Sequence, residues 1–317
     1  MTLSTRTATT AGIGLGFLAD AVLGDPRRLH PVAGFGQLAA ALEAHSYADR
    51  RAAGLRHAAT LVGGIAAAAL VAARAVRRRP LLGLLLSAAA SWAVLGGRSL
   101  RREAEMISAS LASGDLLGAR VRVRNLVGRD TADLSAEEVA RATVESVAEN
   151  TSDAVVAPLF WAAVAGLPGL LTYRAINTLD AMIGHRSPRY LRFGWAAARL
   201  DDATNWLPAR LAGVLTVATA TLIAGSPAQA WRAWRHDAGR HPSPNAGVVE
   251  AAFAGALGVR LGGRNLYEGR VEERGLLGEG RPVEVSDITR AVRLSQLVSA
   301  AALLVAITLR WLRPGGR

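Results

Sequence analysis

The chain has 317 residues, of which 51% are hydrophobic, and its mean hydropathy is +0.23, yet its formal net charge is +12. A soluble domain rarely combines these properties. The sequence contains no cysteine, which excludes disulfides, thiolate zinc sites and cysteine nucleophiles. It contains no lysine either, which excludes Schiff-base chemistry and a P-loop lysine. All 37 basic residues are therefore arginines, whose planar guanidinium groups suit phosphate and carboxylate.

Apolar runs rich in Ala, Leu and Val account for the hydropathy. They occupy residues 58–76, 80–97, 208–225 and 294–309, and each is close to the roughly 20 residues that a bilayer crossing needs. Arginines flank these runs, where anchoring at the lipid headgroups explains them better than nucleic-acid binding, which we do not expect. We predict an all-α integral membrane protein of one polytopic domain, with about four to six transmembrane helices and cytoplasmic helical loops.

The N-terminal region begins with an apolar stretch at 11–24, which we interpret as a first crossing or an interfacial helix. The polar loop GDPRRLHPVAGFG follows, and loops on a rigid scaffold often carry function. Its Asp25 and His30 are candidate ligand-binding residues. The alternative is that Asp25 only starts a turn and His30 is only solvated. Residues 37–57 suggest an amphipathic helix outside the bilayer.

Residues 98–149 are predicted to form a water-side helical segment. Ser135 and Glu138 have the spacing of a capping box, which predicts a helix from about Ala136 into the region of Asn150. Glu145, Glu149 and Asp153 then follow at intervals of one turn and share a helix face. Such carboxylates repel one another unless a cation or an arginine lies among them.

The stretch 145–189 holds two copies of the pattern Asn-Thr-x-Asp, at 150–153 and 177–180. Between them lies an apolar segment with a Gly-Leu-Pro-Gly break at 166–169, and Gly and Pro together interrupt helices. A re-entrant helical hairpin, which we favour, places Asp153 opposite Asp180. A single crossing stays open, and it separates the two motifs. The simplest alternative is that these acids only cap a membrane segment.

Residues 173–211 form the most polar stretch beside an apolar run. Its candidate site residues are Arg174, Asn177, Asp180, His185, Arg186, Arg189, Asp202 and Asn205. On a helix, Asn177 and Asp180 share a face, as do Asp201 or Asp202 with Asn205. For Asp202 and Asn205 the alternative is an N-cap region ahead of the apolar run at 208–225.

Residues 226–292 are predicted to be a water-side loop. Trp231 and Trp234, next to arginines, are typical of interfacial anchors. The stiff loop HPSPNAG, which contains Asn245, leads into a predicted helix at 246–258. That helix carries Glu250 on an otherwise apolar surface, and a buried acid without a partner is expensive, so Glu250 is a candidate functional residue.

Several separated motifs resemble one known family. They are GDPRRLHPVAGFG, ENTSDAVVAPLFW, YRAINTLDAMIGHRSPRY, FGWAAARLDDATNWLPARL and HPSPNAGVVEAAFAGALGVRLGG, and they span about Leu18 to Gly269. In this order they resemble the CobD/CbiB family of cobalamin-biosynthesis proteins, the adenosylcobinamide-phosphate synthases. The resemblance implies a multi-pass enzyme of the bacterial inner membrane that joins adenosylcobyric acid to (R)-1-amino-2-propanol phosphate, or a related amino alcohol, with ATP.

The implied chemistry suggests roles for the candidate residues. Activation of a carboxylate by ATP needs Mg²⁺, for which we assign Glu149, Asp153 and Asp180 as ligands. Asp153, Asp180 and His185 form the catalytic group, with His185 as the base. The remaining candidates bind substrate, with the arginines as phosphate and carboxylate clamps. They are Asp25, His30, Asn150, Arg174, Asn177, Arg186, Arg189, Asp202, Asn205, Asn245 and Glu250. No Walker or dinucleotide-binding motif occurs in a usable context.

Two other classes of function stay open, a membrane transporter and a membrane sensor or scaffold. A transporter is expected to carry acids near the centres of several spans, whereas here the acids gather at span ends beside arginines. The expected partners are the two substrates and the lipid bilayer, with other cobamide-assembly enzymes or a second copy of the chain as further candidates.

Overall fold

The structure, a computed structural model, describes residues 4–26, 30–267 and 270–312. Its contacts divide the chain into two compact units. Unit 1 comprises Met1–Gly96, Ala157–Asn205 and Leu303–Arg317, and unit 2 comprises Gly97–Val156 and Trp206–Ala302. Each unit is described by itself below. The prediction of one polytopic membrane domain stays a prediction.

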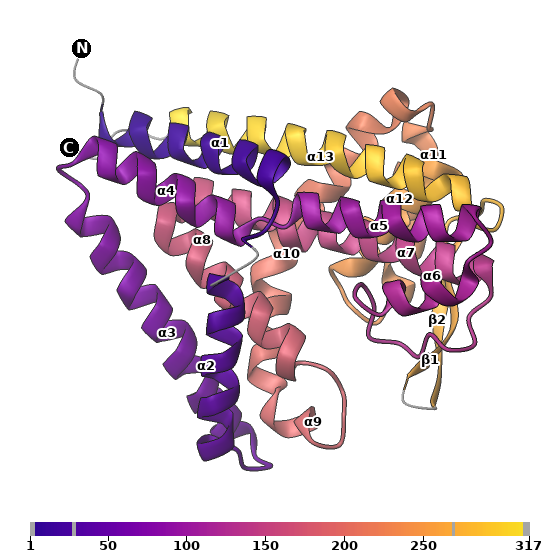
Figure 1. Ribbon diagram of the computed structural model, residues 1–317, viewed down its shortest axis with the longest axis horizontal. Helices are drawn as coiled ribbons and strands as arrows, with labels where there is room; N and C mark the ends of the chain where they lie inside the picture. The colour runs from indigo at the N-terminus through magenta and orange to yellow at the C-terminus, as the bar shows by residue number, and fades with distance from the viewer. Residues whose placement is uncertain (1–3, 27–29, 268–269, 313–317) are drawn as a thin grey trace. The chain divides into compact units, whose positions relative to one another are not determined.

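Unit 1 is helical in its described residues (Figure 1). Ser4 caps the first helix by accepting a hydrogen bond from the Thr7 amide, and prolines occupy the first turn of α2 and α4, where their missing N–H is not needed. The elements are α1 (Thr5–Leu23), α2 (Pro31–Ser46), α3 (Arg51–Ala75), α4 (Pro80–Val94), α8 (Ala157–Ile183), α9 (Tyr190–Phe193), the start of α10 (Trp195–Thr219) and the end of α13 (Val285–Leu312).

The helices α1 and α4 pack closely along small residues (Figure 1). A Cβ atom added at Gly12 would lie 2.8 Å from the Cβ of Ser87, and one added at Gly16 would lie 2.6 Å from the carbonyl oxygen of Ala88. Both distances are shorter than real side chains tolerate, so the two glycines allow the backbones to approach. Glycines four residues apart promote such close packing of helices in membranes.

A reversal of the chain at Gly166 divides α8 into two arms. Gly166 has φ +65° and ψ −148°, a conformation that is not helical and that only glycine adopts readily. A Cβ added at Gly169 would lie 3.1 Å from the carbonyl carbon of Trp161, whereas in one straight helix these residues would be about 12 Å apart along the axis. The chain therefore forms a helical hairpin at the Gly-Leu-Pro-Gly break, as the sequence predicts.

Unit 2 contains mostly helices and one β-hairpin. Its elements are α5 (Gly97–Ala112), α6 (Leu116–Val123), α7 (Ala136–Thr151), the π-helical turn η1 (Ser152–Val156), the end of α10, η2 (Ala220–Ile223), α11 (Pro227–Asp237), η3 (Ala238–Arg240), α12 (Ala246–Leu257), β1 (Leu261–Tyr267), β2 (Arg270–Leu277) and the start of α13. The strands pair antiparallel, with a bulge between Leu261 and Gly263. The sequence analysis did not predict this hairpin, because its strands lack a regular alternation of apolar and polar residues.

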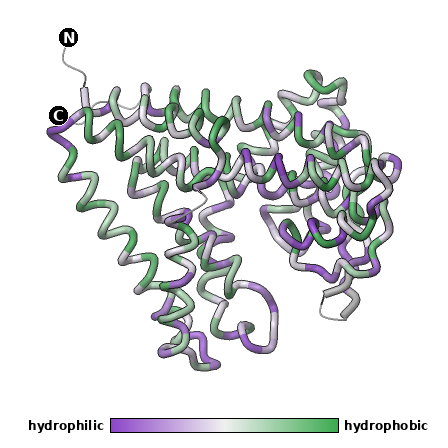
Figure 2. The backbone as a smooth tube through the Cα atoms, viewed as in Figure 1, coloured by the Kyte–Doolittle hydropathy of each residue, from purple (hydrophilic) through white to green (hydrophobic). Residues whose placement is uncertain are grey.

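Five helices among the described residues are long and apolar enough to cross a membrane. They are Arg51–Ala75, Pro80–Ala112, Ala136–Ile183, Trp195–Ile223 and Val285–Leu312, and their number confirms the predicted class of multi-pass helical membrane protein. In Figure 2 the helices α3 and α4 are largely green, whereas the turn that joins them is purple. This contrast fits a transmembrane pair with an arginine-rich turn.

Some predicted boundaries were wrong. The helix predicted at 37–57 does not exist as one element, since α2 ends at Ser46 and α3 begins at Arg51. The apolar runs at 208–225 and 294–309 belong to longer helices, which begin at Trp195 and Val285. In both longer helices, polar turns precede the apolar run, and a search for apolar runs leaves those turns out.

Candidate functional site

The helix α7 carries a buried carboxylate network in unit 2. It begins as predicted, with Ser135 and Glu138 forming a reciprocal capping box. Near the middle of the helix, Glu145 is buried. Its Oε1 accepts hydrogen bonds from the Gly262 amide at 2.8 Å and from Arg141 Nη1 at 3.1 Å, and its Oε2 accepts one from Arg129.

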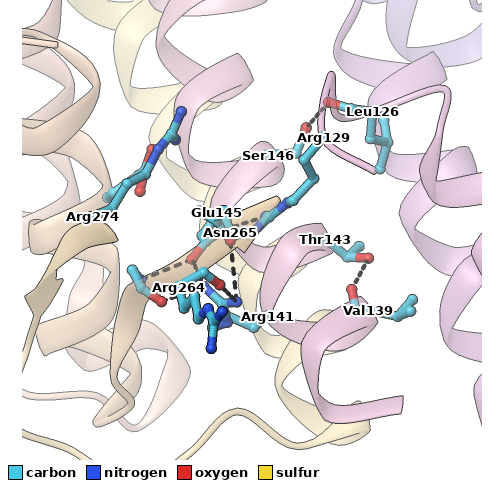
Figure 3. Close-up of polar contacts among 12 residues, drawn as sticks. Leu126, Arg129, Val139, Arg141, Thr143, Glu145, Ser146, Arg264, Asn265 and Arg274 are labelled. Carbon is cyan, nitrogen blue, oxygen red and sulfur yellow. Dashed lines mark hydrogen bonds and ion pairs between the residues drawn. The ribbon is translucent and has the colours of Figure 1, made fainter. Parts of the chain in front are cut away.

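Asn265 of β1 completes this network (Figure 3). Its Oδ1 accepts hydrogen bonds from Arg129 and from Arg141 Nη2, the latter at 3.2 Å. Arg141 also donates to the carbonyl oxygens of Gly262 and Arg264. Two arginines therefore neutralise Glu145 and join α7 to β1, so the arginine that the sequence analysis required among the carboxylates is present.

The three carboxylates of the predicted face have different environments. Glu145 is buried, Glu149 is exposed and Asp153 is half-buried in the π-helical turn. Asn150 donates back to the carbonyl oxygen of Ser146 at 3.0 Å. π-helical turns widen the helix and occur frequently at functional sites, and of the three carboxylates Asp153 is the one that lies in such a turn.

A second buried group in unit 2 surrounds Glu250 of α12, whose residue surface is only 3% exposed. His241, which is 8% exposed, places Nε2 3.6 Å from Glu250 Oε1. Arg274 Nη1 lies 3.4 Å from the same nitrogen, and the Ser243 amide donates to Nδ1 at 3.0 Å. Glu250, whose burial without a partner would cost free energy, therefore lies beside a histidine.

Both groups of this pair favour their neutral forms. Burial, together with the charge of Arg274, lowers the pKa of His241 to about 4. Burial, together with the charges of Glu145 and Glu149, raises the pKa of Glu250 well above its ordinary value. Burial therefore favours the neutral forms of both groups, an imidazole and a protonated carboxyl group, over an ion pair.

Asn245 lies just before α12, as the sequence analysis predicts for the end of the HPSPNAG loop. Its Oδ1 accepts a hydrogen bond from Arg210 Nη1 at 2.8 Å. Arg210 also lies over the ring of Trp206, 4.7 Å from its centroid. The loop is therefore held against α10 within unit 2.

Unit 1 contains a polar cluster built from α8 and α10. Tyr173 donates to Asn205 Oδ1 at 2.8 Å, and Asn205 Nδ2 donates to Asp201 Oδ2 at 2.9 Å. Asn177 Nδ2 donates to Asp201 Oδ1 at 3.4 Å, and Arg174 Nη1 donates to Asn177 Oδ1 at 3.4 Å. The second Asn-Thr-x-Asp motif thus contacts the polar turn of α10.

This cluster corrects two expectations. Asp202 and Asn205 do not form an N-cap region, because α10 begins at Trp195 and both lie inside it. The carboxylate that joins the cluster is Asp201, whereas Asp202 lies 3.5 Å from Arg199 Nη1. The spacing alone allowed either aspartate to face Asn205, so the sequence could not distinguish them.

The loop after α8 holds further predicted residues. Arg189 Nη2 lies 2.8 Å from Glu43 Oε1, and its guanidinium lies 4.1 Å from the ring centroid of Tyr47. The hydrogen bond to Glu43 raises the pKa of Arg189. His185 is exposed and packs edge-on against Tyr190, with ring centroids 5.0 Å apart. Arg189 is therefore already engaged with a carboxylate, which reduces its capacity to clamp a phosphate.

The other predicted residues of unit 1 lie at helix ends. Asp180 is half-buried in the last turn of α8, and Arg186 is exposed in the loop that follows. Asp25 is half-buried just after α1. His30 is the N-cap of α2, where its Nδ1 accepts a hydrogen bond from the Val32 amide at 3.2 Å. His30 therefore caps α2, and this structural role accounts for a histidine at this position without a ligand.

The predicted site residues divide between the units. Unit 1 contains Asp25, His30, Arg174, Asn177, Asp180, His185, Arg186, Arg189, Asp202 and Asn205, and unit 2 contains Glu149, Asn150, Asp153, Asn245 and Glu250. The pairing of Asp153 with Asp180 stays a prediction. In the part of the chain that the structure describes, no group of three or more His, Asp or Glu side chains is arranged to hold a metal ion.

The sequence analysis missed several polar residues that the structure brings to these clusters. They are Arg129, Arg141, His241 and Arg274. Arg141 lies one turn before Glu145 on α7, a spacing that could have indicated the ion pair. Arg129 and Arg274 come from segments without a helical pattern, and the sequence carries no signal for their contacts.

The fold and its buried charged clusters define a multi-pass helical membrane protein with polar sites at the ends of its helices. Residues 13–295 match the family described as CobD/Cbib protein. The chain therefore belongs to the CobD/Cbib family, which implies a role in cobalamin biosynthesis and confirms the resemblance found in the motifs.

Curated relatives agree with this membership. A cobalamin biosynthesis protein CobD of Mycobacterium tuberculosis is 52% identical over 315 residues, which cover 99% of each chain. The proteins of the same name from Chromobacterium violaceum and Geobacter metallireducens are 47% and 44% identical, covering 92% of this chain and 96% and 92% of their own lengths. No solved structure matches the chain.

Proposed function

We propose that the protein joins adenosylcobyric acid to (R)-1-amino-2-propanol phosphate, or a related amino alcohol, in an ATP-dependent amide ligation that yields adenosylcobinamide phosphate. The observation that carries this proposal is family membership over nearly the whole chain. The proposal places the protein in the bacterial inner membrane.

The reaction must activate a carboxylate, because a carboxylate and an amine do not condense in water. In the proposed route, a propionate oxygen of the corrinoid attacks the γ-phosphorus of ATP, and ADP leaves. The amine then attacks the carbonyl carbon of the acyl phosphate, loses a proton, and expels inorganic phosphate. The products are the amide, ADP and phosphate, so atoms and charges balance.

Glu149 and Asp153 fit the requirements of a Mg²⁺ site. They lie about one helical turn apart in unit 2, where Glu149 is exposed and Asp153 is half-buried. Mg²⁺ commonly takes one or two carboxylates and fills its other positions with water and phosphate oxygens. When bound, the ion would offset negative charge on the phosphates of ATP. Asp180 is proposed as a further carboxylate of this site.

Further predicted residues are proposed to bind the substrates. Arg174 and Arg186 are proposed to hold the phosphate or carboxylate groups of the substrates, since guanidinium groups bind such oxyanions bidentately. His185 is exposed and is proposed to accept the proton of the substrate amine. Glu250 and His241 are buried, and burial favours their neutral forms, which suits a role in fixing the site rather than in the proton transfer itself.

The experiment that tests this function uses the purified full-length protein in detergent or nanodiscs. Adenosylcobyric acid, aminopropanol phosphate, ATP and Mg²⁺ are supplied, and adenosylcobinamide phosphate and ADP are measured. We expect equal amounts of both products and none when ATP is left out. Absence of product from correctly folded protein with active substrates would refute the proposal and favour a scaffold or sensor role.

A further inference from the structure

A cavity lies within unit 1 at the end of the α8 hairpin. Its volume is about 240 Å³, and it is bounded by α1, by the end of α3, by α4, by the hairpin around Gly166 and by Arg310 of α13. Most of its wall is apolar, with Ile13, Leu86 and Leu170 among the lining side chains. The residues named for this wall all belong to unit 1. We call it the tip cavity.

Arg310 closes one side of the tip cavity and stabilises the hairpin. Its Nη1 donates to the carbonyl oxygen of Ala162 at 2.9 Å, and its Nη2 and Nε donate to the hydroxyls of Thr9 and Thr10 at 2.9 and 3.1 Å. The chain reversal at Gly166 prevents the last carbonyl groups of the first arm from forming helical hydrogen bonds. Arg310 satisfies one of them and brings positive charge to a helix C-terminus.

Polar groups of the tip cavity are of two kinds. Arg77, exposed in the turn after α3, provides a second guanidinium group. Ser87 and Ser91 of α4 provide hydroxyl groups. Ser91 is only 1% exposed, and its Oγ has no hydrogen-bond partner among the described residues. A buried hydroxyl without a partner costs free energy, so Ser91 provides an unused hydrogen-bond donor in the cavity lining.

The apolar wall, the guanidinium group of Arg77 and the serine hydroxyls together favour one class of ligand. A small phosphorylated metabolite would leave most of the apolar wall in contact with polar groups, at a cost in free energy. A hydrocarbon would leave the Ser91 hydroxyl without an acceptor. A phospholipid provides ester oxygens for the hydroxyls, an acyl chain for the apolar wall and a phosphate for the arginine. The site also lies beside helices that are long enough to cross a bilayer.

The volume limits how much of the lipid enters. The cavity of about 240 Å³ corresponds to about eight water molecules at ~30 Å³ each. It can therefore hold the glycerol ester region and the first part of one acyl chain, while the remainder lies in the bilayer. The positive charge of Arg77 favours an anionic headgroup, because each arginine near an anionic lipid surface contributes about 1 kcal/mol.

We propose that the tip cavity binds one anionic phospholipid, with its phosphate at Arg77, its ester groups at Ser87 and Ser91 and the first part of an acyl chain against the apolar wall. The lipid supports the end of the hairpin beside Arg310. This site is independent of the proposed ligation and of its substrates.

Titration of the purified full-length chain in mild detergent tests this site. Dioleoyl phosphatidylglycerol, dioleoyl phosphatidylcholine and inorganic phosphate are added separately, and bound lipid is measured by native mass spectrometry. We expect phosphatidylglycerol to bind about fivefold more tightly than phosphatidylcholine, the factor that corresponds to about 1 kcal/mol. Inorganic phosphate at the same concentration should neither compete with the lipid nor raise the midpoint of thermal unfolding.

Two pairs of variants locate the binding. Arg77→Gln should reduce the preference for phosphatidylglycerol to about one, whereas Arg74→Gln, in the last turn of α3 and outside the cavity lining, should retain it. Ala73→Trp should fill the cavity and weaken both lipids, whereas Ala72→Trp, outside the lining, should not.

Three results would overturn the proposal. They are equal affinity for the two lipids, displacement of lipid by inorganic phosphate, and equal losses for Arg77→Gln and Arg74→Gln. The comparison of Arg77→Gln with Arg74→Gln tests the proposal even if the tryptophan variants fail to fold, because both arginines are exposed.

Discussion

Replacement of Glu145 by Gln removes the charge that two buried arginines share. The side chains of Arg129 and Arg141 are 4% and 12% exposed, so neither can recover full hydration when the carboxylate is lost. Removing one partner of a buried ion pair costs about 3–5 kcal/mol. Because Gln can still accept the hydrogen bond from the Gly262 amide, we expect a loss near the lower limit, about 3 kcal/mol of the free energy of unfolding.

Denaturant titration of the purified protein in mixed micelles measures this loss. Glu105→Gln on α5 is the matched control, because Glu105 is exposed in the same unit, and its change is expected to stay within about 0.5 kcal/mol. The double variant Arg129→Leu with Glu145→Gln should lose less than the sum of the single variants, since the first change removes a charge that the second leaves uncompensated. A loss below about 1 kcal/mol for Glu145→Gln would refute the network as a source of stability.

Further variants test the other structural claims. The folded protein holds His241 neutral with a pKa of about 4, against 6.5 ordinarily, so stability falls as the pH drops between these values, by on the order of 3 kcal/mol. His241→Gln should flatten that decline in a pH series of unfolding. Glu250 has the opposite effect, because its pKa is raised. Stability falls as the pH rises above 4.5, and Glu250→Gln should remove this decline. Gly166→Ala should cost about 1–3 kcal/mol through backbone strain, and Arg310→Leu about 2 kcal/mol through lost charged hydrogen bonds. Both losses would appear in the same denaturant titration, and an unchanged midpoint in either variant would contradict the hairpin geometry.

Local signals predicted much of the fold. Ser135 and Glu138 indicated the start of α7 because a capping box depends only on nearby residues. The Gly-Leu-Pro-Gly break indicated the hairpin for the same reason, since the positive φ of Gly166 is a local property. The β-hairpin of unit 2 was not predictable in this way. Contacts of Asn265 and Gly262 with arginines and Glu145 of other segments contribute to its stability.

The candidate site was predicted less completely than the fold. Glu250 was identified because a carboxylate in an apolar helix needs a partner, but nothing in the sequence indicated that this partner is His241. Asp201 and Asp202 are adjacent, and only the orientation of α10 relative to α8 within unit 1 selects Asp201 for the cluster. Pairings between distant segments depend on tertiary packing, which periodicity and spacing do not encode.

Turnover of the carboxylate variants tests the central claim most directly. Asp153→Asn and Asp180→Asn are compared with Asp133→Asn, an exposed aspartate of the loop before α7, in the ATP-dependent synthesis of adenosylcobinamide phosphate. Membrane accumulation and elution in size-exclusion chromatography confirm folding. The proposed function predicts that both site variants lose more than about 100-fold in turnover, as expected when a group that stabilises developing charge is removed, while Asp133→Asn retains wild-type turnover. Near-normal turnover in either site variant would contradict the assignment.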